Sequence, residues 1–130
     1  MTRPTLLVAG LLAGLALASC GGDDKKVSKD CLPGSDPALE AAARAHVDKI
    51  IVGAKPVDAD KVEVDTCRTS DQDATATVTV LGVKDKLVRD QRHQVTLEKR
   101  NAKWAIVRDL DTQRCREGHG HKKFSSVQCG

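Results

Sequence analysis

The sequence predicts an α+β fold in which one N-terminal helix packs on a four-stranded antiparallel meander sheet braced by two disulfides. Apolar residues recur at three-to-four spacing from residue 39 to residue 51, and the period changes to two from residue 62 onward. The chain also has five cysteines, an odd number. A helix stripe and one face of a sheet can bury each other, which gives a two-layer domain.

Residues 1–19 form the first predicted element, an export signal. Arg3 supplies the positive start, the run from Leu6 to Leu17 is apolar, and small residues follow it. A transmembrane helix needs about 20 apolar residues, whereas this run has about 12. The segment therefore predicts a cleaved signal peptide and not a membrane span.

The end of this segment, Leu17-Ala18-Ser19-Cys20, resembles the lipobox of bacterial lipoproteins. The resemblance implies cleavage before Cys20, diacylglycerol on its thiol, and acylation, for example with palmitate, of the new amino group. Two acyl chains anchor a small domain stably, so we expect a lipid-anchored protein on the extracytoplasmic side of a cell-envelope membrane. The alternative is an ordinary secretory signal whose junction carries a cysteine.

The stretch 20–30 follows the lipobox and is polar, with Val27 as its single aliphatic residue. It cannot pack against a core, so we expect a tether. Residues 31–130 then form the single predicted α+β domain, since 111 residues remain after cleavage and suffice for one modest core.

Four cysteines remain once Cys20 is assigned to lipid: Cys31, Cys67, Cys115 and Cys129. An even number in an exported chain predicts two disulfides. Three pairings are possible, and we favour Cys31 with Cys67 and Cys115 with Cys129. The alternative, a zinc site, lacks any Cys-x-x-Cys spacing.

The predicted helix begins near Ser35-Asp36-Pro37, where a capping side chain precedes a proline in the first turn. It continues to about Val52, before Gly53 and Pro56 end it. Its apolar stripe contains Leu39, Ala42 or Ala43, His46 or Val47, Ile50 and Ile51.

Four strands are predicted after the helix, because β-branched residues alternate with polar ones between turn signals. The turns are at 69–73, 84–86 and 100–103. The strands are expected at 62–67, at 74–83, in a segment ending with 93–98, and at 104–108.

A second resemblance comes from the run Val95 to Ile106 together with Asp73 to Val78. This pattern is similar to the sheet of cystatin-like and NTF2-like lipoprotein domains, in which a tryptophan such as Trp104 opens the last strand. The similarity extends over roughly residues 36–112. It implies a helix-on-sheet fold with a ligand pocket between the two layers.

His119 and His121 are the sharpest local pattern, since residues two apart in an extended segment project to one side. Such a pair can bind Cu²⁺, Ni²⁺ or Zn²⁺ if a third ligand is supplied, and Glu117 is the nearest carboxylate. The alternative is a solvated loop closed by Cys115 and Cys129. The sequence predicts no metal site, with this pair as the weak exception.

His46 and His93 share the apolar parity of their predicted elements, so both are expected between helix and sheet. A pocket shared with Asp48 or Asp90 would make either histidine an acid/base group. The alternative is a satisfied, partly buried histidine. Trp104 is expected either to pack in the core or to line a ligand pocket.

The functional prediction is a non-enzymatic envelope module that contacts the membrane through Cys20 and binds an envelope protein. No phosphate-binding loop, nucleophile elbow or His-Glu-x-x-His is present, and no cofactor is predicted. Only 2% of the residues are aromatic, which disfavours nucleic-acid binding. The alternative function is small-ligand or Cu/Zn binding, through the NTF2-like pocket or the His119/His121 pair.

Charge is unevenly distributed, with eight Lys or Arg against three Asp or Glu in residues 99–123. This basic end is either solvated beside an anionic membrane or a specific anion site.

Overall fold

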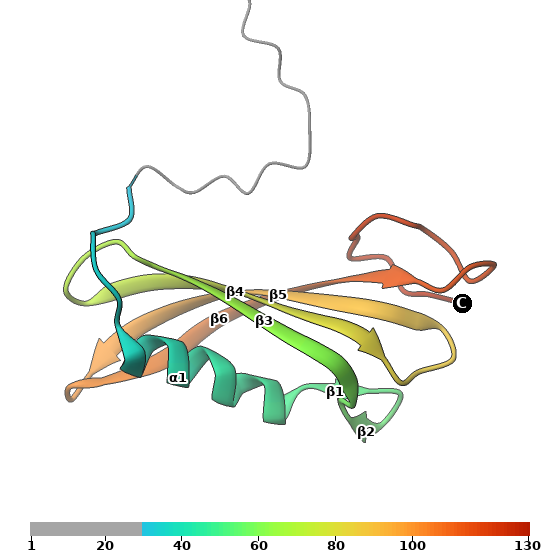
Figure 1. The fold of residues 1–130 in the computed structure, drawn as a ribbon, viewed down its shortest axis with the longest axis horizontal. Helices are drawn as coiled ribbons and strands as arrows, with labels where there is room; N and C mark the ends of the chain where they lie inside the picture. The colour runs from blue at the N-terminus through green and yellow to red at the C-terminus, as the bar shows by residue number, and fades with distance from the viewer. Residues whose placement is uncertain (1–29) are drawn as a thin grey trace, which may run out of the picture.

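A computed structural model describes residues 30–130, and its elements form a helix, a short hairpin and a four-stranded sheet (Figure 1). The predicted signal peptide, Cys20 and all but the last residue of the tether lie outside the described residues. The elements are α1 (Pro37–His46), the 3₁₀ turn η1 (Val47–Lys49), β1 (Ile51–Val52), β2 (Lys55–Pro56), β3 (Ala59–Arg68), β4 (Asp73–Val83), β5 (Val88–Arg100) and β6 (Lys103–Cys115).

Helix α1 starts where the sequence predicts. The Asp36 side chain accepts a hydrogen bond of 3.0 Å from the Leu39 amide, and Pro37 occupies the first turn. The predicted end near Val52 is wrong. The helix ends at His46, and η1 then leads into β1, because β-branched Ile51 and Val52 pair with β2 across a tight turn at Gly53 and Ala54.

The main sheet is an antiparallel meander in the order β3-β4-β5-β6. This confirms the predicted fold class. The last strand is longer than predicted, since β6 continues past Arg108 to Cys115 and stays paired with β5 until Val88. The sheet therefore extends well beyond the end of α1 (Figure 1).

The core lies between α1 and one face of the sheet. It consists of small and medium aliphatic side chains, which fits a chain with one Trp, one Phe and no Tyr. Its buried members are Leu39, Ala43, Ile50, Ala74, Ala76, Val78, Val80, Val83, Val95, Leu97 and Trp104. Trp104 packs in this core and donates its indole N–H to Asp36 Oδ2 at 3.1 Å, so one carboxylate caps the helix and fixes the tryptophan.

Two disulfides confirm the favoured pairing. Cys31–Cys67 ties the segment before α1 to the end of β3, and Cys115–Cys129 closes the C-terminal segment onto the end of β6. Ser125 also pairs with Gln113 across the outer edge of β6. The C-terminal segment, red in Figure 1, is thus fixed to the end of the sheet that projects past α1.

Candidate functional site

The helix-facing side of the sheet changes from apolar to polar as it passes the end of α1. Near the start of α1 this side carries Ala74, Leu97 and Ile106. Farther along, the same side carries a row of polar residues from β5 and β6. Three of them, Gln91, His93 and Gln113, are buried. The row contains Gln91, His93, Asp109, Asp111 and Gln113.

A bulge in β6 creates half of this row. Leu97 is paired with Ile106, but Thr96 is paired with Arg108, so β6 has one extra residue at this point. Without it, the alternation that begins at Trp104 would direct Leu110 toward the helix. Instead Asp109 is directed inward, and Leu110 is turned to solvent with 48% of its surface exposed.

Asp109 lies between two imidazole rings that arrive from different elements. Its Oδ2 is 2.6 Å from Nε2 of His46, at the end of α1. Both of its oxygens are 3.0 Å from Nδ1 of His93, on β5. The two rings are 5.8 Å apart at their centroids and nearly perpendicular. We call these three residues the His-Asp-His cluster.

Gln91 extends this cluster along β5. Its Oε1 is 3.3 Å from Nε2 of His93, so both ring nitrogens of His93 have polar partners. His93 is the most buried member, with 7% of its side chain exposed, against 16% for His46 and 30% for Asp109. The cluster therefore opens to solvent on the Asp109 side.

The charge of Asp109 is favoured by its neighbours. Burial raises the pKa of this carboxyl group, but the hydrogen bonds from His46 and His93 outweigh burial and hold the pKa below the usual value. Asp109 is thus an anion near neutral pH, placed between two nitrogen donors.

A small polar pocket adjoins the cluster where the sheet projects past α1. It has a volume of about 250 Å³. The β1–β2 hairpin, the Cys129 end of the C-terminal segment, and Gln91, Asp111 and Gln113 line it. The pocket lies beside the end of the helical segment and not beneath α1.

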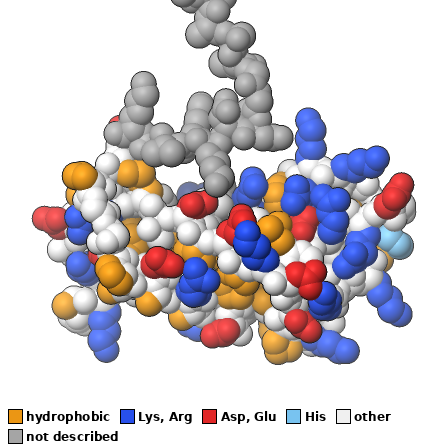
Figure 2. Space-filling model, viewed as in Figure 1, with side chains coloured by type: hydrophobic (Ala, Val, Ile, Leu, Met, Phe, Trp, Pro, Cys, Tyr) orange, Lys and Arg blue, Asp and Glu red, His pale blue; other side chains and the backbone are white. Residues whose placement is uncertain are grey.

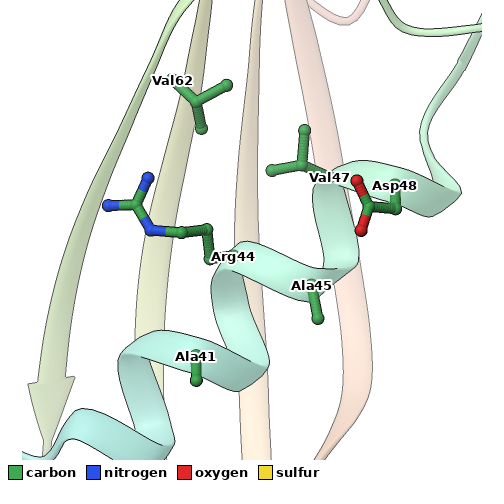
Figure 3. A pocket seen from close by; sticks show the side chains of 6 residues that line it. All are labelled: Ala41, Arg44, Ala45, Val47, Asp48 and Val62. Atoms are coloured by element: carbon green, nitrogen blue, oxygen red, sulfur yellow. The ribbon is translucent and has the colours of Figure 1, made fainter.

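A second, wider groove lies between α1 and β3. Ala41, Arg44, Ala45, Val47, Asp48 and Val62 line it (Figure 3). Asp48 therefore lines this groove and is not in the His-Asp-His cluster.

The carboxylate that joins the two histidines is one that the sequence did not single out. His46 and His93 do lie together between helix and sheet, as their parity predicted, but their partner is Asp109 and not Asp48 or Asp90. Helical and strand periodicity predicted the inward orientation of both histidines. Asp109 was missed because the predicted last strand stopped at Arg108, and a bulge leaves no clear signal in the sequence.

Asp90 lies on the opposite face of the sheet, where it organises arginines. It accepts hydrogen bonds from the Gly82 amide at 3.0 Å and from Arg89 and Arg114 at 2.9 Å. Burial raises the pKa of Asp90, but these donors outweigh burial and hold it below the usual value.

Phe124 of the C-terminal segment packs on this opposite face between two guanidinium groups. Arg92 is 4.0 Å and Arg114 4.4 Å from the ring centroid. Figure 2 shows Lys and Arg side chains gathered toward this end of the molecule. Arg114, one of the basic residues between positions 99 and 123, thus interacts within the molecule with Asp90 and Phe124.

The His119/His121 pair is not gathered into a ligand set within residues 30–130. His121 has carbonyl oxygens of Lys123 and Val127 at 2.8 Å from its two ring nitrogens. His119 Nδ1 lies 3.3 Å from the carbonyl oxygen of Gly130. Cys115 and Cys129, which lie near His121, are bonded to each other and so offer no thiolate.

The chain matches no known protein family, no curated protein and no solved structure. The site must therefore be interpreted from its own geometry. Among residues 30–130, α1 is too short and too polar to cross a bilayer.

Proposed function

We propose that this protein is an exported, lipid-anchored and non-enzymatic binding module of the cell envelope, whose partner is another envelope protein. The anchor would be Cys20. Four of the five cysteines are paired in two disulfides, which is typical of an oxidising, extracytoplasmic compartment. The fifth cysteine is the one in the lipobox-like sequence.

The observation that carries the binding role is the outer edge of β6. This strand lies at one end of the sheet. Among residues 30–130, its outer edge is covered near its C-terminal end, where Gln113 pairs with Ser125 and Cys115 donates its amide N–H to the carbonyl oxygen of His121. Val107 and Leu110 are exposed along it, at 38% and 48%. An edge strand with exposed aliphatic side chains is a surface on which another chain can add by strand pairing.

The anchor is tested first by mass spectrometry of the full-length gene product extracted in mild detergent, before and after reduction. We expect a chain that starts at Cys20 and carries acyl groups, and a gain of four hydrogens when the disulfides are reduced. The Cys20→Ser variant should lack the acyl mass and leave the membrane fraction. An unacylated wild-type chain would end the lipoprotein proposal.

The partner surface is tested by photo-crosslinking in intact cells. A photoreactive residue at position 110 should give a discrete crosslinked band, whereas one at position 65, exposed on β3, should not. The Val107→Lys substitution should weaken the band from position 110. Equal labelling from both positions would argue against β6 as the binding edge.

A second candidate function is binding of a small polar ligand, and the pocket of about 250 Å³ supports it. Gln91 and Gln113 are buried at its wall, and amide side chains there can both donate to and accept from a ligand. A Gln113→Leu variant should lose such a ligand, detected as surplus mass in native mass spectrometry of the wild-type protein.

A further inference from the structure

We propose that His46, His93 and Asp109 bind a divalent transition-metal ion of the Zn²⁺ class. The inference depends neither on the lipid anchor nor on a protein partner. It concerns residues other than the His119/His121 pair, which the sequence had singled out.

The distances between the ligand atoms suit an ion. One ligand atom from each of the three residues lies within 4.8 Å of the other two. Zinc bonds to imidazole nitrogen and carboxylate oxygen are about 2.0–2.2 Å long, which places tetrahedral ligands about 3.3 Å apart. The present contacts of 2.6 and 3.0 Å need to lengthen by less than about 1 Å to admit the ion.

The charges favour a cation at the same point. A carboxylate faces one nitrogen from each of two imidazoles, and each nitrogen must present either a proton or a cation to Asp109. A metal ion satisfies all three groups at once. Asp111, which pairs with His93 in the sheet register, adds a second carboxylate to the same face.

Gln91 provides the outer support that metal-binding histidines usually have. When His93 Nε2 carries the proton it can donate to Gln91 Oε1 at 3.3 Å, and this leaves the lone pair of Nδ1 directed at Asp109. In this tautomer His93 Nδ1 is free to coordinate a metal ion.

The ligand set also indicates which ion binds. Two imidazoles and one carboxylate suit Zn²⁺, Co²⁺, Ni²⁺ or Cu²⁺, whereas Ca²⁺ and Mg²⁺ prefer sites made of oxygen alone. The exposed part of Asp109, 30% of its side chain, gives the ion access and leaves a coordination position for water. The β6 bulge contributes to this site because it directs the Asp109 carboxylate inward.

The test is calorimetric titration of the purified mature protein, with both disulfides formed and metal removed by chelation. We expect Zn²⁺ to bind in a one-to-one complex, and Ca²⁺ and Mg²⁺ to give no heat. His46→Ala and Asp109→Asn should each weaken binding by at least about ten-fold, and Gln91→Ala by about ten-fold. His119→Ala is the matched control and should bind like the wild type.

Co²⁺ provides a second readout, because its visible absorption reports the ligand set. The Co²⁺ spectrum should disappear in His46→Ala and persist in His119→Ala. If circular dichroism shows that His93→Gln does not fold, the His46→Ala and Asp109→Asn variants test the proposal, because these two side chains are partly exposed. No Zn²⁺ binding by the wild type, or binding that depends on His119 and not on His46, would overturn the proposal.

Discussion

At the scale of single residues, three aspartates each join separate parts of the molecule. Asp36 caps α1 and binds Trp104, Asp90 gathers two arginines, and Asp109 joins helix to sheet. The pKa of each is held below the usual value by these donors, although burial opposes the shift. Their stabilising contribution is therefore present above a pH of about 3.8 and is lost as the pH falls through the lower folded values.

Asp90→Asn tests this argument at the most buried of the three. The free energy of unfolding at neutral pH should fall by about 2–3 kcal/mol, because two guanidinium groups lose their anion. Urea unfolding at a series of pH values should show the deficit narrowing below about pH 3.8, where the wild-type carboxyl group also becomes protonated. Asp65→Asn, on exposed β3, is the control, and a pH-independent deficit would contradict the prediction.

At the scale of elements, β6 decides what the site contains. A strand that alternated regularly from Trp104 would direct Leu110 to the helix and Asp109 to solvent. The bulge reverses this for the remainder of the strand, so Asp109, Asp111 and Gln113 face the helix side and Leu110 does not. Polar burial of this kind weakens a small core, which is why we propose that the row binds a metal ion or a small polar ligand.

Leucine truncation on β5 and β6 tests the effect of the bulge. Leu110→Ala should change the free energy of unfolding by less than about 0.5 kcal/mol, because the side chain is already exposed. Leu97→Ala, at 0% exposure on the neighbouring strand, should cost about 3 kcal/mol. Chemical denaturation measures both, and similar losses would mean that Leu110 faces the core.

At the scale of the whole molecule, two disulfides supplement a core that consists mostly of alanine, valine and leucine. Cys31–Cys67 spans 36 residues and holds the entry to α1 against the sheet, whereas Cys115–Cys129 spans 14 and closes the end of the chain. The longer loop restricts the unfolded chain more strongly.

Removing the disulfides singly should reveal this difference. The Cys31→Ser/Cys67→Ser double variant should lose about 4 kcal/mol of unfolding free energy, and Cys115→Ser/Cys129→Ser about 3 kcal/mol, on chain-entropy grounds. Thermal denaturation of the two variants shows which disulfide contributes more to stability. If the C-terminal pair proves the more stabilising, then contacts of that segment, such as Phe124 between its arginines, contribute more than loop closure.

The sequence by itself determined the helix start, the four-stranded meander, the inward parity of His46 and His93, and the presence of two disulfides. Each of these depends on local periodicity, capping or turn chemistry, or on the even number of cysteines left after Cys20. The tertiary structure alone decided that Asp109 joins the two histidines, that α1 ends at His46, and that β6 runs to Cys115. These features depend on strand register and on contacts between residues far apart in the chain, such as His46 and Asp109, which no local pattern encodes.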